Sequence, residues 1–195
     1  MTIDLIPSEL LARYEVHEWK HACAVLSGDF PEQWSDLLAV LDRFRLPRSQ
    51  VLAPGGGKSP ISKWFDREFG KLGWEEKGFQ TKIVVDDNEL LSPTHKVDCV
   101  KGQVAVEIEW SNKDPFFDRD LNNFRLLFDL RAISAGVIIT KADELRPIFE
   151  ELGVWSKYGT STTWMGKLLP RIEGGGGGGC PILVFGIGRA LYVED

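Results

Sequence analysis

Apolar residues recur at helical spacing through the first third of the chain. A repeat at every third or fourth position predicts helices over residues 10–26, 31–44 and 61–74, the last of them ending near Gly73. The segment between the second and third helices, residues 48–60, is rich in Gly and Pro and predicts a loop. The N-terminal part of the protein is therefore expected to be mainly helical.

The period changes from helical to alternating at Gly78. Short stretches rich in Val and Ile predict a β-meander with strands at residues 78–87, 94–101 and 103–110. The corner Lys101-Gly102-Gln103 joins the last two strands as a hairpin. Helical spacing then returns at residues 118–133, and the compact apolar stretch at residues 135–141 predicts a buried strand.

The last third of the chain completes a mixed pattern. Residues 141–152 and 160–173 predict two further helices, and residues 181–188 predict a last apolar strand. Strands mixed with helices on both flanks predict an α/β or α+β sandwich, with one mixed β-sheet and a single domain over residues 1–195. The six glycines at 174–179 are expected to form a flexible connector before the last strand.

Composition narrows the class of protein. The 195-residue chain is 43% hydrophobic but has no secretory signal and no run of about eighteen apolar residues, so a cytoplasmic protein without a membrane partner is expected. Its three cysteines are scattered and predict neither a zinc site nor a disulfide framework. The formal net charge of −6 does not indicate a nucleic-acid binder, but basic side chains can line one cleft while acidic groups cover other faces.

The stretch GGGKS at residues 55–59 is similar to part of a phosphate-binding loop. That motif needs a glycine at the position of Leu52, and Pro60 interrupts the helix that should follow the loop. A mobile surface loop is therefore the preferred interpretation. Lys58 in this loop could still contact a nucleic-acid backbone.

Three carboxylates lie within the predicted hairpin. Side chains two positions apart on a strand share a face, so Glu107 and Glu109 project together while Val106 and Ile108 point to the other side. Asp98 lies on the partner strand near the base of the hairpin. Each pair of like charges at 4 Å costs roughly 4 kcal/mol at an effective dielectric near 20, which a divalent cation such as Mg²⁺ would offset. The alternative is a solvated strand face, on which Val and Glu commonly alternate.

The spacing of these acids resembles the metal site of the restriction endonuclease fold, usually written PD…(D/E)XK. Asp98 is followed nine residues later by Glu107 and then by Glu109, and the hairpin runs into Trp110-Ser111-Asn112. This arrangement is similar to the BglII and BstYI type of restriction endonuclease. The resemblance is most specific over residues 95–141, and further similar segments are Pro115-Phe116, Asn122-Asn123, 137–141, 160–163 and 181–186.

The resemblance implies a Mg²⁺-dependent type II restriction endonuclease with a mixed β-sheet flanked by helices on both faces. Asp98 and Glu107, aided by the carbonyl of Ile108, would bind Mg²⁺, which would polarise the scissile phosphate and lower the pKa of an attacking water. Glu109 stands where the broad superfamily usually has Lys, although Glu or its amide occurs there in BglII and BamHI. Glu109 would orient or deprotonate the water, or help to hold a second metal.

Five residues are expected to contact DNA. Ser111 and Asn112 match a pair that reaches the bases in BglII, and Asn can read adenine through two hydrogen bonds; alternatively they form a turn after the strand. Arg125 would contact DNA or pair with a neighbouring acid. Ser161 and Thr162 lie in a segment that resembles a base-reading loop and that would also suit the N-cap of the following helix.

The relatives act as homodimers on short palindromes with a GATC core, because a two-fold symmetric protein reads a two-fold symmetric site. Double-stranded DNA, a second copy of the chain and a companion DNA methyltransferase are therefore the expected partners. Helices at 118–131 and 142–152 are candidates for the dimer face, since the first has more apolar surface than one side of a sheet needs. Two other functions are open: a DNA-binding protein without cleavage, and a structure-selective repair nuclease of the same fold.

Overall fold

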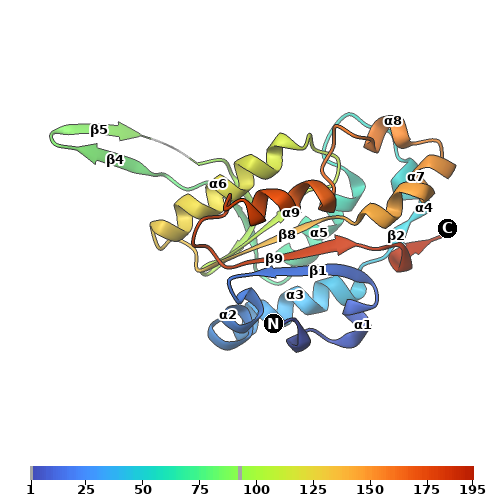
Figure 1. The fold of residues 1–195 in the computed structure, drawn as a ribbon, viewed down its shortest axis with the longest axis horizontal. Helices are drawn as coiled ribbons and strands as arrows, with labels where there is room; N and C mark the ends of the chain where they lie inside the picture. Colours follow the sequence, from blue (N-terminus) through green and yellow to red (C-terminus); the bar gives the residue numbers. More distant parts are fainter. Residues whose placement is uncertain (1, 92–93) are drawn as a thin grey trace.

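A six-stranded mixed β-sheet forms the centre of the computed structural model, which describes residues 2–91 and 94–195 (Figure 1). In sheet order the strands are β1 (Tyr14–Trp19), β9 (Ile182–Ile187), β8 (Ala135–Lys141), β7 (Val104–Ile108), β6 (Val97–Lys101) and β3 (Glu75–Lys77). The pairs β7–β8 and β8–β9 are parallel, and the other three pairs are antiparallel. The expected mixed sheet and the hairpin that turns at Gly102 are confirmed.

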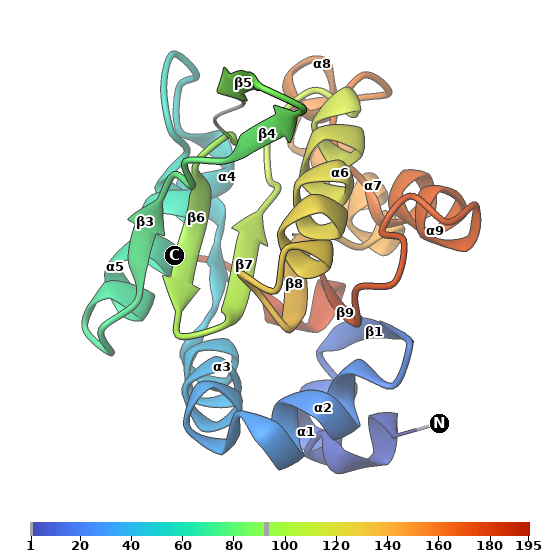
Figure 2. The same ribbon diagram turned by 90° about the vertical axis from the view of Figure 1, so that its left-hand side faces the viewer.

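Helices cover both faces of the sheet (Figures 1 and 2). They are α1 (Ser8–Leu11), α2 (Ala22–Asp29), α3 (Pro31–Arg43), α4 (Arg48–Leu52), α5 (Pro60–Gly70), α6 (Pro115–Asp129), α7 (Arg146–Glu151), α8 (Trp155–Tyr158) and α9 (Met165–Glu173). Short 3₁₀ turns span Ile3–Leu5, Asp143–Leu145 and Arg189–Leu191, and β2 (Leu46–Pro47) pairs with β10 (Tyr192–Val193). Among the described residues, every helix is too short or too polar to span a bilayer.

Two hydrophobic clusters lie on opposite faces of the sheet. Val106 and Ile108 of β7 pack into the cluster that includes α2, α3 and α5, whereas Ala105 packs into the cluster that includes α6 and α9. Because the side chains of a strand alternate between faces, Glu107 projects to the same side as Ala105. It therefore points toward α6.

The N-terminal segment differs from the predicted helix over residues 10–26. Tyr14–Trp19 forms the edge strand β1 and pairs with β9, and helix resumes only at α2. This strand contains aromatic and β-branched residues, which favour β-structure. Its hydrogen bonds to β9 outweigh the helical spacing of the sequence. Lys20 and His21 make the turn with φ of 54° and 58°. A short helix, α4, also lies within the predicted loop.

The predicted meander is wrong in its pairing. Strands β4 (Lys82–Val85) and β5 (Asn88–Leu91) pair with each other as a separate two-stranded ribbon, which projects from the body of the protein (Figure 1). The two-residue turn Asp86-Asp87, with φ of 52° at Asp86, places β5 directly beside β4. Strand β4 therefore pairs with β5 and not with a strand of the main sheet. We call residues 82–91 the arm.

The glycine run at residues 174–179 is a packed turn, so the prediction of a flexible connector is wrong. A Cβ at Gly177 would lie 2.4 Å from Ile182 Cδ1. At Gly178, where φ is +57°, a Cβ would lie 2.5 Å from Arg125 Cγ. Larger residues would therefore push α6 and β9 away from the turn, and close approach is the reason for glycine here.

Candidate active site

The β6–β7 hairpin brings Asp98 and Glu107 side by side. Cys99 pairs with Val106, so the next position outward sets Asp98 opposite Glu107. The main-chain N–H of Asp98 donates to Glu107 Oε2 at 3.3 Å, and the N–H of Ile108 donates to Asp98 Oδ2 at 3.0 Å. Backbone donors therefore hold both carboxylates in place.

A cleft of about 290 Å³ opens beside this hairpin. Its lining includes Asp98, Ile108 and Glu109, together with Ser111 and Asn112, which lie three and four residues after the end of β7. Residues expected for catalysis and residues expected for base contact therefore border one cavity. This juxtaposition follows from their closeness in the sequence at the end of one strand.

Helix α6 contributes two charged residues that sequence reasoning missed. Asp120 is only 1% exposed, and Arg119 donates from Nε to Asp120 Oδ1 at 2.8 Å. The same guanidinium lies 3.5 Å from Glu109 Oε1. Neighbouring acidic and basic residues are common in helices, so the sequence alone does not single out this pair. Only the packing of α6 on the sheet reveals that the pair faces the site.

Burial raises the pKa of Glu107 and of Glu109. The pKa of Glu107 lies well above its usual range because the side chain is buried, and the nearby Asp120 and Asp98 act in the same direction. Burial and Asp120 also raise the pKa of Glu109 to about 9, against the opposing effect of the hydrogen bond from Asn112. Without an added positive charge, burial therefore favours the protonated form of both side chains, and Glu109 carries a proton near neutral pH.

The donor set fits a hard divalent cation. Within the described part of the chain, Glu107 Oε1, Glu109 Oε2 and Asp120 Oδ2 are buried without a hydrogen-bond partner, an arrangement that costs free energy until a donor or cation approaches. No three acidic, histidine or cysteine side chains among the described residues form a preformed metal cage. Mg²⁺ does not need one, because it is usually held by one or two carboxylates with water and substrate phosphate.

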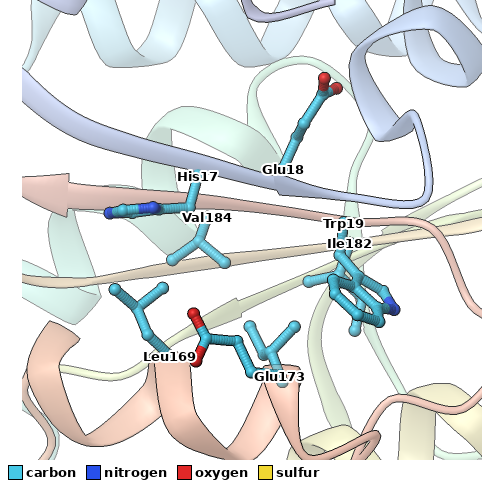
Figure 3. Close-up of a pocket in the computed structure, with 8 residues that line it drawn as sticks. His17, Glu18, Trp19, Leu169, Glu173, Ile182 and Val184 are labelled. Carbon is cyan, nitrogen blue, oxygen red and sulfur yellow. The ribbon is translucent and has the colours of Figure 1, made fainter. Parts of the chain in front are cut away.

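A second cleft of about 200 Å³ lies between β1 and α9 (Figure 3). Trp19, Leu169 and Val184 give it mainly apolar walls, and Glu18 points away from it to the other side of the strand (Figure 3). On that side Glu18 Oε2 accepts a hydrogen bond from the hydroxyl of Thr2 at 2.7 Å. This cleft lacks the set of converging acids found beside the hairpin, so we assign the candidate active site to the hairpin cleft.

Comparison with known proteins agrees with this geometry. The model of the family described as restriction endonuclease BglII/BglIII matches residues 14–187. The chain belongs to this family. A search of curated proteins found no match.

Membership of the BglII/BglIII family confirms the expected restriction-endonuclease-like fold and makes the protein a DNA-cleaving hydrolase whose partner is double-stranded DNA. Restriction endonucleases generally use divalent metal ions, which agrees with the oxygen donors of the cleft. The matched range includes the whole hairpin cleft. It begins at the first residue of β1 and ends at the last residue of β9.

Two loops that resemble base-reading segments of the BglII type lie against each other. The N–H of Thr163 donates to the carbonyl of Asn112 at 3.0 Å, and Lys113 Nζ donates to Ser161 Oγ at 3.0 Å. Ser161 is thereby brought close to the segment that carries Ser111 and Asn112. Ser111 and Asn112 border the cleft, and Ser161, about 50 positions later in the chain, lies beside their segment without lining it.

The other two expected DNA contacts are placed differently. Thr162 is buried, and its hydroxyl donates to the carbonyl of Tyr158 at 2.9 Å. Arg125 lies outside the cleft lining, with its stem against Gly178. The predicted N-cap is wrong: α9 begins at Met165, and among the described contacts no side chain caps it.

A fully buried lysine lies behind the loop that carries Asn112. Lys141, the last residue of β8, donates from Nζ to the carbonyl of Trp110. The ammonium is 5.3 Å from the ring centroid of Trp110 and 5.0 Å from that of Trp164. Burial lowers the pKa of Lys141 to about 7, while Glu109 acts in the opposite direction.

We expect Lys141→Met to remove one component of the pH dependence of stability. The unfolded lysine keeps its proton up to about pH 10.5, whereas the folded one loses it near pH 7. Between these values the unfolded state binds more protons, so this group makes the free energy of unfolding rise with pH by at most about 1.4 kcal/mol per unit. Urea unfolding of both proteins from pH 6 to 10 measures the difference. Parallel pH profiles would contradict the prediction.

Proposed function

We propose that this protein is a Mg²⁺-dependent type II restriction endonuclease that cuts both strands of a short palindrome with a GATC core. One observation carries the proposal: Asp98 and Glu109 line a cleft that Ser111 and Asn112 also border, and Glu107 lies buried beside Asp98. The proposal treats residues 1–195 as one domain that acts as a homodimer. It also includes a companion DNA methyltransferase, which would protect the sites in the cell's own DNA.

In this proposal the acids of the hairpin hold the cation and direct the water. Asp98 and Glu107, with the carbonyl of Ile108, would hold Mg²⁺, which supplies positive charge to the scissile phosphate when it is bound. Glu109 Oε1 accepts from Asn112 Nδ2 at 3.0 Å, which leaves its other oxygen to orient the attacking water and take its proton. Arg119 acts against burial and favours the ionised form of Glu109.

Digestion of plasmid DNA of known sequence tests the proposal. Discrete fragments whose ends map to GATC-containing palindromes are expected with Mg²⁺, and none with Asp98→Ala or Glu107→Ala. A smear of fragments, or fragments that survive both substitutions, would reject it. Sequence-specific binding without cutting in Mg²⁺ or Mn²⁺ would identify a DNA-binding protein, and selective cutting of branched DNA would identify a repair nuclease.

The reason for placing the dimer face on residues 118–131 does not hold. Leu121, Phe124 and Leu127 are buried in the chain's own core against the sheet. Leu130, 55% exposed, is left at the end of α6. The apolar residues that suggested a dimer face are thus buried within one copy of the chain.

The arm offers a more exposed apolar surface for the homodimer. Val84, Val85, Leu90 and Leu91 are between 55% and 75% exposed. A two-stranded ribbon is marginally stable alone in water and gains from packing against another surface. Its acidic residues, Asp86, Asp87 and Glu89, disfavour the phosphate backbone of DNA. The proposed occupant is therefore a second copy of the chain.

Removing apolar side chains from the arm is expected to shift the protein to monomers. In the double variant Val85→Thr/Leu90→Thr the dissociation constant should rise by at least about a hundredfold, since each buried aliphatic side chain contributes about 1.5–3 kcal/mol. Sedimentation velocity at micromolar concentrations measures this, with circular dichroism to verify the fold. The matched control is Leu130→Thr. A dimer lost in the control but kept in the arm variant would place the interface on α6 instead.

A further inference from the structure

A lysine from outside the hairpin enters the candidate active site. Lys58 Nζ lies 2.8 Å from Asp66 Oδ2 and 3.2 Å from Asp98 Oδ1. It belongs to the glycine-rich loop at residues 53–59, and both Lys58 and Asp98 line the hairpin cleft. We propose that Lys58 is an exchangeable counter-ion: it neutralises Asp98 in the metal-free protein and moves to a DNA phosphate when a divalent cation binds. This inference rests on the proposed function.

The bonding of Asp98 favours the exchange. Its Oδ2 accepts from the N–H of Ile108 at 3.0 Å, and its Oδ1 is the atom nearest to Lys58. Oδ1 accepts no N–H from the described backbone, so it is the freer oxygen for a divalent cation, and the ammonium of Lys58 lies 3.2 Å from it. Two positive charges a few ångströms apart repel each other strongly at the low effective dielectric of a cleft, so Lys58 would move away from Asp98 when that acid holds a cation.

The loop around Lys58 leaves room for such a movement. A Cβ added at Gly55, Gly56 or Gly57 would have none of the described atoms within 4 Å, so packing does not lock this segment. The chain is anchored again at Ser59, whose side chain accepts from the N–H of Ser62 to cap α5. Lys58 can thus swing about a defined point at the start of a helix.

A neighbouring cleft shows where the ammonium can go. This cleft, of about 310 Å³, is lined by the glycine-rich loop and by Lys157, and it shares Ser59, Ser111 and Asn112 with the hairpin cleft. The two clefts therefore form one groove, with Lys58 at their junction. The N-terminus of α5, with Ser59 and Pro60, lines the same groove, and its helix dipole favours an anion there. A phosphate of the bound strand is the anion that would lie there.

Lys58 and Arg119 differ in how they are held. Arg119 lies on α6 and is paired at 2.7 Å with Asp120, which is 1% exposed. Lys58 is 38% exposed and is shared between two partly exposed acids. Arg119 is thus a permanent charge of the site, whereas the contacts of Lys58 can be exchanged for water or phosphate.

Lys58→Met tests the proposal because its two expected effects have opposite signs. Without DNA, the affinity for Mn²⁺ should rise about tenfold, since a competing unit charge is removed from Asp98. At saturating Mn²⁺, single-turnover cleavage of DNA should fall about a hundredfold, since a cation on the phosphate is lost. Isothermal titration calorimetry and electron paramagnetic resonance of Mn²⁺ measure the first effect. Lys63→Met, an exposed lysine on α5, is the control and should change neither.

A role in structure alone would lower both quantities, so a weaker or unchanged Mn²⁺ affinity in Lys58→Met would overturn the proposal. Unchanged cleavage would overturn it as well. Lys58→Arg keeps the charge and should return the Mn²⁺ affinity to that of the unaltered protein and cleavage to within about tenfold. If the unaltered protein cuts no DNA, the proposed function fails, while the Mn²⁺ titration still decides whether Lys58 competes with the metal.

Discussion

Glu107→Gln is expected to reduce the single-turnover rate of DNA cleavage by at least about a thousandfold, which corresponds to about 4 kcal/mol of transition-state stabilisation. Glu107 is 1% exposed and has one buried oxygen without a partner among the described atoms. Glutamine keeps the shape of the side chain but cannot take the negative charge that holds a cation. Cleavage with saturating Mg²⁺, measured with a radiolabelled duplex, provides the test.

The same substitution should leave the metal-free fold intact. Because burial raises the pKa of Glu107, the folded protein without metal favours the neutral acid, which glutamine closely matches. The free energy of unfolding should therefore change by less than about 1 kcal/mol. Mg²⁺ should raise the melting temperature of the unaltered protein and not that of the variant. Glu75→Gln, on the exposed edge strand β3, is the control; a Glu107→Gln variant that cuts within tenfold of it would refute the assignment.

Arg119→Met is expected to lower both stability and cleavage. Removing one partner of a buried ion pair typically costs about 3–5 kcal/mol. Arg119 is 27% exposed and Asp120 can take up a proton, so we expect about 2 kcal/mol here. Cleavage should fall about a hundredfold at neutral pH, since Glu109 loses the positive charge that favours its ionised form. Urea unfolding and single-turnover cleavage measure the two effects.

A double-mutant cycle separates the ion pair from other roles of Arg119. In Arg119→Met/Asp120→Asn the buried acid is absent together with its partner, so most of the lost stability should return. Cleavage should stay low, because the charge beside Glu109 is still missing. Equal stability losses in the single and double variants would show that Arg119 stabilises the fold through packing of its stem.

Strand alternation made the central part of the site predictable. Glu107 and Glu109 are two positions apart on a short Val-rich strand, and the tight turn at Gly102 sets Asp98 opposite Glu107. The buried strands β8 and β9 were also predictable, because short runs of Val, Ile and Leu bounded by turn residues are typical of buried strands. In these segments the local pattern and the tertiary environment favour the same structure.

Elsewhere the tertiary environment decides. The helical spacing of residues 10–26 gave no sign that Tyr14–Trp19 would pair with a strand about 170 residues later. Likewise Asp66, Arg119 and Asp120 reach the site from two helices, and no spacing in the sequence connects them with the hairpin. The glycine run has a role only through its neighbours, since the close approach of Ile182 and Arg125 is invisible in the chain itself.

In the proposed function, the amide group of Asn112 would serve two tasks. Its Nδ2 already donates one hydrogen to Glu109, and the second hydrogen and the amide oxygen are the pair with which asparagine reads adenine. A correct base pair would thus hold the amide, and through it the carboxylate of Glu109, in one orientation. On an incorrect base the carboxylate would lose that alignment. Discrimination between DNA sites would then appear in the turnover rate more than in binding affinity. The enzyme could therefore bind many incorrect sequences without cleaving them.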